Sequence, residues 1–303
     1  MNKLFVAGHK GMVGSAICRF NTEYDIITVD KSDLDLRNQA EVDSFIKFAK
    51  PDKVVICSAK VGGIHANNTY PADFIYDNLM IQSNIINSAY KYKIQRLLFL
   101  GSSCIYPKFA PQPIPEDALL TSPLEPTNEA YALAKIAGLK MCQYYRKQYG
   151  VTYHSAMPCN LYGKNDNYHP QNSHVIPGLI HRFHCANIDG LEEVHIWGSG
   201  TPLREFLFVD DLAQVCLKLL DIPNPPDWVN VGTTQEVTIL DLAKMIAKVV
   251  GYKGEIKTGD PALDGTPRKK VDCSLLHSLM DFKETTLVEG LTVSYKDYLN
   301  KIV

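Results

Sequence analysis

The chain lacks a long apolar run, an excess of charge of either sign, and a regular spacing of cysteines. Although 46% of its 303 residues are hydrophobic, no run approaches the ~20 apolar residues that span a bilayer. The 31 basic and 33 acidic side chains leave a formal charge of −2, so no overall positive field attracts nucleic acid or an anionic membrane. We therefore expect a well-cored, soluble protein whose partners are neither nucleic acid nor membrane, and whose ligands bind at local sites.

The eight cysteines give no sign of a metal cluster or of a disulfide framework, because no two of them form a Cys-x-x-Cys pair. Such scattered cysteines are typical of a protein that works in a reducing compartment. The first residues, Met1 to Gly8, indicate a strand rather than a secretion signal. These features predict a cytoplasmic protein without a bound metal.

Short apolar runs alternate with helix-length segments over the first half of the chain. This alternation is typical of βαβ units, and it predicts an α/β fold of the Rossmann type with a doubly wound parallel sheet. Polar, turn-rich stretches then follow, so we expect a dinucleotide-binding domain at 1–163 and a smaller substrate-binding lobe at 164–303. A helix predicted from Asp210 to Leu220 and a strand at Asn230–Gly232 would return the chain to the sheet within 208–235. The runs that predict the other strands are Leu4–Ala7, Ile26–Val29, Lys53–Cys57, Leu97–Leu100 and Tyr153–Met157.

A glycine-rich turn, Gly8-His9-Lys10-Gly11-Met12-Val13-Gly14, follows the first predicted strand and leads into a predicted helix. Glycines at this spacing allow a tight turn, a close approach of backbone N–H groups to a pyrophosphate, and close packing of the helix against the strand. A strand before the turn and a helix after it are the context that a dinucleotide site requires. The residues predicted to bind NAD(P) here are Gly8, Lys10, Gly11, Met12, Val13 and Gly14.

The residues near the end of the second predicted strand leave the choice of coenzyme open. Asp30 ends that strand, where a carboxylate accepts hydrogen bonds from the ribose of NAD and repels a 2′-phosphate. Lys10 and Lys31 favour the opposite choice, because either ammonium can pair with the 2′-phosphate of NADP. Asp35 and Leu36 are expected to meet the adenine edge.

Tyr131 and Lys135 stand four residues apart in a predicted helix, downstream of a strand that ends at Gly101-Ser102. Residues at this spacing lie on one helix face, so the ammonium should sit beside the phenol and favour its ionised form. Ser102, at the strand end, can hydrogen-bond the same carbonyl oxygen that Tyr131 protonates. The three residues therefore predict a site that transfers a proton to or from a carbonyl group.

The glycine turn, Ser102 and the Tyr131/Lys135 pair together resemble the extended short-chain dehydrogenase/reductase family. Six further stretches, spread over nearly the whole chain, are similar to the GDP-L-fucose synthases of that family. The resemblance implies 3,5-epimerisation of GDP-4-keto-6-deoxy-D-mannose and then reduction at C4 with NADP(H), although Asp30 would also permit NAD. The six stretches are residues 59–64, 67–75, 101–107, 172–177, 197–206 and 264–269.

The same resemblance implies roles for individual residues. Ser102, Tyr131 and Lys135 would serve the reduction, while Cys104 and His174 would serve the epimerisation. The implied contacts to the nicotinamide coenzyme are Leu100, Gly101, Tyr131, Lys135, Pro158, Asn160, Leu161 and His174. The implied contacts to the GDP-sugar are Arg182, Trp197, Arg204 and Asp264.

The chemistry of a 4-keto sugar explains why such residues belong together. The ketone acidifies the C–H bonds at C3 and C5, because the carbanion left behind is an enolate whose charge rests on the C4 oxygen. Ser102 and Tyr131 are expected to stabilise that oxygen. Cys104 is the expected base and His174 the expected acid, since imidazole titrates near neutrality. The same two oxygen donors then assist hydride transfer to C4.

Two other classes of protein share part of this pattern. A GDP-mannose 4,6-dehydratase or a UDP-sugar 4-epimerase has the glycine turn and the Tyr/Lys pair, but it has no need of Cys104 together with His174. A non-catalytic dinucleotide sensor keeps the glycine turn and often loses the tyrosine. Net consumption of NAD(P)H separates the expected reductase from all of these alternatives.

Two predicted helices, Asp73–Lys91 and Glu129–Tyr149, carry apolar residues on more than one face, which is more than packing on one sheet requires. In the resembling family such helices form a four-helix contact between subunits. We therefore expect a homodimer. The apolar residues that favour it are Ile81, Ile85, Ile86 and Ala89.

Overall fold

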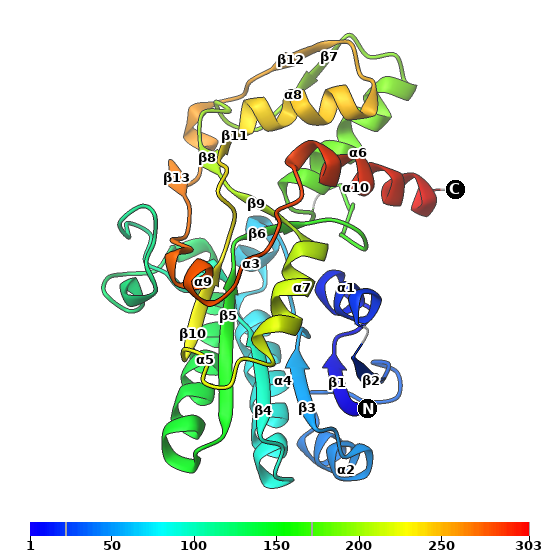
Figure 1. Cartoon of the computed structure of the whole chain (residues 1–303). Helices are drawn as coiled ribbons and strands as arrows, with labels where there is room; N and C mark the ends of the chain where they lie inside the picture. Colours follow the sequence, from blue (N-terminus) through cyan, green and yellow to red (C-terminus); the bar gives the residue numbers. More distant parts are fainter. Residues whose placement is uncertain (22, 171, 303) are drawn as a thin grey trace.

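The computed structural model describes residues 1–21, 23–170 and 172–302, and its largest element is a six-stranded parallel sheet (Figure 1). From one edge to the other its strands are β10 (Trp228–Val231), β5 (Thr152–Pro158), β4 (Arg96–Leu100), β3 (Lys53–Ile56), β1 (Asn2–Ala7) and β2 (Tyr24–Ile27). Every neighbouring pair runs parallel. The Rossmann-type fold predicted from the alternation of apolar runs is therefore confirmed.

Helices cover both faces of this sheet, which is why its strands are apolar on both sides. The helices are α1 (Met12–Phe20), α2 (Gln39–Ala49), α4 (Pro71–Lys91), α5 (Glu129–Tyr149) and α7 (Val209–Leu219). In β1, Leu4 and Val6 point into the core beside α1 and α7. Phe5 and Ala7 point into the opposite core beside α2 and α4, and α5 packs along α4 and β5. The alternation of side chains along a strand thus supplies two cores at once.

The structure shifts the predicted second strand two residues toward the N-terminus, from Ile26–Val29 to Tyr24–Ile27. β2 ends at Ile27 rather than at Val29, so Asp30 lies beyond the strand and not at its end. The reason is that β2 forms one edge of the sheet, and its pairing with β1 stops where Ile27 faces Phe5. β3 also ends one residue early, at Ile56. Asp30 therefore belongs to the connection after β2, next to the glycine turn.

The second half of the chain builds a smaller region above the sheet in Figure 1. Helices α6 (Val175–Ile188), α8 (Ile239–Val250) and α10 (Leu287–Ile302) enclose a separate apolar core. Strand β7 (Glu193–His195) pairs with β12 (Glu255–Lys257), and β8 (Leu203–Arg204) lies between β11 (Val237–Thr238) and β13 (Arg268–Lys269). Strands β6 (Asn160–Tyr162) and β9 (Phe206–Phe208) pair in parallel. The division of the chain into two domains at residue 163 stays a prediction.

The remaining elements are short. They are α3 (Ile64–Thr69), α9 (Ser274–Leu279) and four 3₁₀ turns, η1 (Ser103–Ile105), η2 (Glu116–Ala118), η3 (Pro126–Asn128) and η4 (Pro261–Leu263). Within the described ranges, no helix has the length and the apolar character of a membrane span.

The residues that favoured a homodimer do not form an outer face of α4. Ile85, Ile86 and Ala89 are fully buried within the single chain, and Ile81 packs against the same core. The cause is the packing of α4 against α2 and α5 as well as against the sheet, which covers apolar positions on several sides of the helix. The argument for a dimer from these four residues is therefore wrong.

Candidate active site

The glycine turn has the geometry that a dinucleotide requires. Gly8 adopts a positive φ of 86°, and a Cβ there would lie 2.7 Å from the backbone nitrogen of Ser58. A Cβ on Gly14 would collide with the carbonyl oxygen of Gly8, so only glycine lets α1 start so close to β1. Gly11 caps α1 and its N–H donates to the Gly8 carbonyl at 3.0 Å. Met12 and Val13 pack against the core beneath the turn. The glycines thus leave the backbone of the turn open to a pyrophosphate, and side chains at these positions would block it.

Asp30 is paired with the glycine turn itself. Lys10 Nζ lies 2.5 Å from Asp30 Oδ2, and His9 Nε2 lies 3.1 Å from Oδ1. The hydrogen bond from Lys10 lowers the pKa of Asp30. Lys31, in contrast, is exposed. The charge of Asp30 is therefore balanced within the chain, which weakens its repulsion of a 2′-phosphate.

Arg37 is a candidate coenzyme residue that the sequence reasoning missed. Its guanidinium bonds Asp35 at 2.8 Å and Asp77 at 3.1 Å, and the pairing lowers the pKa of Asp35 to about 2. The neighbouring Leu36 packs into the core behind the loop. An arginine shortly after the second strand is the residue type that accommodates a 2′-phosphate, and this position was the available signal. Asp35, predicted at the adenine edge, is engaged by Arg37 instead of standing free.

Ser102, Tyr131 and Lys135 come together where β4 ends and α5 begins. Tyr131 lies in the first turn of α5, with its ring edge-on to Phe74 at 6.4 Å. One turn later Lys135 lies 5.8 Å from the centre of the Tyr131 ring. Its Nζ donates to the carbonyl of Leu100 at 2.8 Å. The shared helix face predicted from the spacing is present.

The electrostatics of this pair differ from the expectation. Burial raises the pKa of Tyr131, Cys104 raises it further, and a hydrogen bond with Ser102 opposes both. Burial also lowers the pKa of Lys135 to about 8. Because the lysine points at the Leu100 carbonyl and the pKa of Tyr131 is raised rather than lowered, the predicted ionised phenol is wrong. Tyr131 instead remains a protonated donor at neutral pH.

Cys104 joins the same site through η1. Its backbone N–H donates to Ser102 Oγ at 3.2 Å, and Lys269 Nζ lies 3.5 Å from its sulfur. The thiol is half-buried. Cys104 also contributes to the raised pKa of Tyr131, and Ser102 forms hydrogen bonds with both residues. Lys269 is a second residue that the sequence reasoning missed.

His174 approaches from the other lobe as the N-cap of α6. The carbonyl of the preceding Ser173 would lie 3.1 Å from a Cβ on Gly63, so the start of α6 lies against the loop that follows β3. His174 is open in part to solvent, yet desolvation by the surrounding protein lowers its pKa. Burial therefore favours the neutral form of this imidazole, and its role as the acid stays a prediction.

The other predicted coenzyme contacts lie at the carboxyl ends of β4 and β5. Leu100 is buried at the end of β4, and a Cβ on the adjacent Gly101 would collide with Met157 of β5. Pro158 ends β5, beside Val231 of β10. After Cys159, Asn160 and Leu161 are the first two residues of β6, and Asn160 Nδ2 donates to the Glu205 carbonyl at 3.1 Å. Leu100, Gly101 and Pro158 thus lie at the carboxyl end of the parallel sheet, where α/β folds bind ligands, and β6 follows directly after it in the chain.

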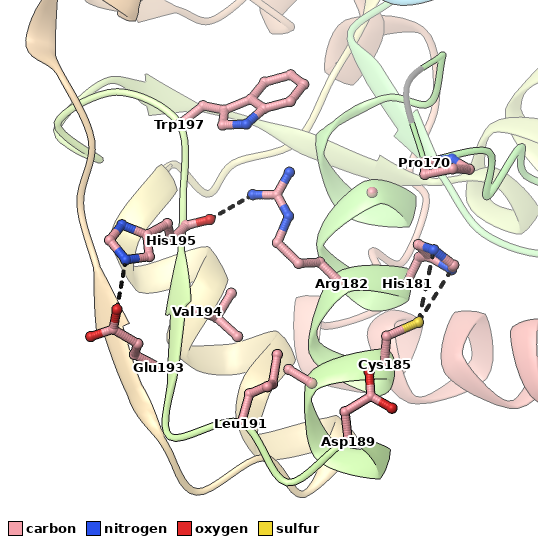
Figure 2. Close-up of a pocket in the computed structure, with 12 residues that line it drawn as sticks. Pro170, His181, Arg182, Cys185, Asp189, Leu191, Glu193, Val194, His195 and Trp197 are labelled. Atoms are coloured by element: carbon pink, nitrogen blue, oxygen red, sulfur yellow. Dashed lines mark hydrogen bonds and ion pairs between the residues drawn. The ribbon is translucent and has the colours of Figure 1, made fainter.

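A pocket of about 510 Å³ lies between α6 and β7 (Figure 2). Arg182 extends from α6 toward β7, where it donates to the His195 carbonyl at 2.8 Å. Its guanidinium lies 5.2 Å from the Trp197 ring, and that ring is 69% exposed. Burial lowers the pKa of Arg182. A cation beside an exposed indole ring offers both stacking and anion contacts to a nucleotide.

Arg204 and Asp264 lie nearby but are differently engaged. Asp264 accepts from Ser199 N at 2.8 Å and from Ser199 Oγ at 2.5 Å, so its carboxylate holds the loop after Trp197. Arg204, on β8, donates to the Leu203 carbonyl at 2.7 Å. Burial lowers the pKa of Arg204, while Asp264 raises it. A half-buried guanidinium with donors to spare suits a phosphate.

Comparisons with known proteins agree with this geometry. Residues 4–232 match the model of the NAD dependent epimerase/dehydratase family. The chain is 56% identical to GDP-L-fucose synthase 1 of Arabidopsis thaliana, over 99% of this chain and 94% of that protein. It is 49% identical to GDP-L-fucose synthase of Escherichia coli, over 98% and 96% of the two chains.

Solved structures give the same result for the fold. The GDP-mannoheptose C4 reductase of Campylobacter jejuni with NADP bound superposes with a TM-score of 0.87 at 33% identity, and 98% of each chain is covered. A GDP-L-fucose synthetase from Naegleria fowleri bound to NADP superposes with a TM-score of 0.92 over 99% of this chain and 93% of that one, but at 24% identity it supports the fold alone. The chain therefore belongs to the NAD dependent epimerase/dehydratase family and, within it, to the GDP-L-fucose synthases.

Proposed function

We propose that this protein makes GDP-L-fucose. It inverts C3 and C5 of GDP-4-keto-6-deoxy-D-mannose and then reduces C4 with NADPH, so it acts as an isomerase and as an oxidoreductase. The observation that carries this proposal is that the backbone N–H of Cys104 donates to Oγ of Ser102 at 3.2 Å, so the thiol belongs to the same strand end as the proposed hydrogen-bond donor to the sugar carbonyl. A reductase that does not epimerise its substrate has no use for a thiol beside the residue that donates a hydrogen bond to the sugar carbonyl.

In the proposed mechanism, Ser102 and Tyr131 donate hydrogen bonds to the C4 oxygen of the sugar. The protonated state of Tyr131 suits this role, because a developing enolate needs donors. Cys104 removes the proton from C3 or C5, and His174 in its protonated form supplies a proton on the opposite face and is left as the neutral imidazole. The coenzyme supplies the hydride for C4. Tyr131 then gives its proton to the C4 oxygen, beside Lys135.

We infer NADP as the coenzyme, with NAD as the alternative. The glycine cradle at Gly8, Gly11 and Gly14 fits a pyrophosphate. Arg37 and Lys31 offer positive charge after β2, while Lys10 offsets Asp30. A bound 2′-phosphate could take Lys10 or Arg37 from its carboxylate partner, and the charge balance of the loop favours such an exchange.

We propose that the pocket between α6 and β7 holds the nucleotide part of the GDP-sugar. Trp197 provides an exposed ring on which a base can stack, and Arg182 lies against that ring. Arg204 is proposed to bind the pyrophosphate, between this pocket and Cys104. Asp264 acts on the substrate chiefly through the loop that it holds at Ser199.

A homodimer remains part of the proposal, on different residues from those first considered. Exposed apolar side chains on α4 and α5 are Tyr76, Leu133, Tyr144 and Tyr149. Because α4 and α5 pack against each other, exposed apolar groups on both helices suit a four-helix contact with a second copy. The cytoplasmic location of the protein stays a prediction.

The test is to incubate the protein with GDP-4-keto-6-deoxymannose and NADPH and to identify the product by NMR. Net oxidation of NADPH with formation of GDP-L-fucose is the expected result. An unepimerised 6-deoxyhexose, or conversion without net oxidation as in a dehydratase or a 4-epimerase, would contradict the proposal. A parallel run with NADH decides the coenzyme.

A further inference from the structure

Lys269 reaches the sulfur of Cys104 across the two halves of the molecule. The two residues are 165 positions apart, and Lys269 Nζ lies 3.5 Å from Cys104 Sγ, within hydrogen-bond range for sulfur. Both side chains are half-buried. On its other side, Cys104 is joined to Ser102 through its backbone N–H. The thiol therefore lies between Ser102, which is proposed to donate a hydrogen bond to the sugar carbonyl, and the ammonium of Lys269 on β13.

The backbone fixes the place of Lys269. β13 pairs with β8, and this pairing sets Lys269 opposite Arg204. The next residue, Lys270, donates its N–H to Gln112 Oε1 at 2.9 Å and accepts from the Ile114 N–H at 2.8 Å. The segment that carries Lys269 is thus held by a strand on one side and by the 112–114 loop on the other.

A buried carboxylate adds a third attachment. Glu205 is 1% exposed and accepts from Val271 N at 2.7 Å and from Thr233 N at 3.1 Å. Burial raises the pKa of Glu205 to about 7, while the two backbone donors oppose that rise. A carboxylate buried in this way ties the segment after Lys269 to the loop after β10. Lys269 is therefore presented from a firmly held backbone.

We propose that Lys269 is a positioning residue for the epimerisation, which holds the sulfur of Cys104 beside the sugar carbonyl and stabilises it as a thiolate. This inference rests on the proposed function, in which Cys104 is the base. The thiolate forms an S–H bond as the C–H bond at C3 or C5 breaks, and the electron pair passes to the C4 oxygen. Before that step an ammonium donor stabilises the negative sulfur. Lys269 itself exchanges no proton with the sugar.

The charges around this contact leave Lys269 directed at the thiol. Arg204 is a second cation on the neighbouring strand, and Asp264 is occupied by Ser199. Arg268, on the opposite side of β13, pairs with Glu236 at 2.5 Å. Lys270 donates to the Thr234 carbonyl at 2.9 Å. Lys270 is thus a matched control, since it is adjacent in sequence and bonded elsewhere.

The first test is alkylation of Cys104 by iodoacetamide at neutral pH, followed by peptide mass spectrometry so that each cysteine is scored separately. Only the thiolate reacts. Lys269→Met should slow alkylation of Cys104 by about three- to tenfold, because a half-exposed charged hydrogen bond is lost. Lys269→Arg should keep most of the wild-type rate, and Lys270→Met all of it. No sugar is needed, so this result does not depend on the proposed function.

The second test uses the GDP-4-keto-6-deoxymannose substrate in deuterated water. Lys269→Met should slow deuterium uptake at C3 and C5 by the same factor as alkylation, while NADPH oxidation continues and yields more of the unepimerised sugar. An unchanged alkylation rate in Lys269→Met overturns the inference. So does an equal loss in Lys269→Arg, which would mean that shape rather than charge matters. If Lys269→Met slows alkylation as expected but the wild type takes up no deuterium from the solvent, the proposed function alone is overturned.

Discussion

Replacement of Lys135 by methionine should make the ligand-free protein more stable at neutral pH while it removes the activity. Lys135 is 3% exposed, and burial lowers its pKa from the ordinary 10.5 to about 8. At about 1.4 kcal/mol per pH unit, this lowering corresponds to about 3 kcal/mol of unfavourable free energy for the charged form relative to the neutral amine. Methionine keeps most of the aliphatic volume and carries no charge.

The variant also loses a favourable contact, which reduces the gain. The amine donates to the Leu100 carbonyl at 2.8 Å, and such a hydrogen bond contributes about 1 kcal/mol net. The expected net stabilisation is therefore about 1–2 kcal/mol near pH 7. Because the buried charge of Lys135 costs more stability than its hydrogen bond contributes, the residue serves the reaction rather than the fold.

The sign of the pH dependence follows from the direction of the shift. Between about pH 8 and 10.5 the unfolded chain holds the Lys135 proton and the folded chain does not, so wild-type stability rises with pH over that interval. The advantage of Lys135→Met should then shrink and vanish near pH 10. Urea unfolding of the two proteins at several pH values measures this, with the exposed Lys147→Met as a control on the same helix. A variant that is less stable at every pH would refute the reasoning.

Three further substitutions test the proposed roles. Tyr131→Phe should slow single-turnover NADPH oxidation by about 10²- to 10⁴-fold, since the ring keeps its contact with Phe74 and only the acid is lost; a near-normal rate would remove the phenol from the hydride step. Cys104→Ser should abolish deuterium uptake at C3 and C5, followed by NMR, while part of the NADPH oxidation survives; undiminished uptake would exclude the thiol as base. Asp30→Asn should raise the affinity for NADPH relative to NADH several-fold by releasing Lys10, as measured by fluorescence titration; an unchanged ratio would show that Asp30 does not set the preference.

The parts of the fold that the sequence predicts are those with a local signal. β1 alternates Leu4 and Val6 with Phe5 and Ala7 because each pair enters its own core, and the run of apolar residues records this. Helix α5 has the bounds predicted for it, and its spacing alone places Tyr131 and Lys135 on one face. The end of β2 was not predictable, because an edge strand stops where its single neighbour stops pairing.

The chemistry of the site depends on contacts that have no local signal. The spacing of Tyr131 and Lys135 predicts a shared face, but the direction of the ammonium depends on the Leu100 carbonyl of another element. Lys269 lies in a two-residue strand, too short for any periodic pattern, and only its pairing with β8 brings it to Cys104. Sequence reasoning therefore proposed the reacting groups, but it missed Lys269, which contacts one of them.

The opposed charges within the site explain how one pocket can serve both steps. In the proposed mechanism, the contribution of Cys104 to the raised pKa of Tyr131 keeps the proton on the phenol during proton abstraction, when the enolate needs a donor. Once Cys104 carries the proton taken from the sugar, its sulfur is neutral and no longer raises the pKa of Tyr131. The phenol then gives up its proton more readily. The hydride step requires this proton transfer. Lys269 lies beside the thiol and Lys135 beside the phenol, so each of these two groups has a lysine from a different part of the chain near it.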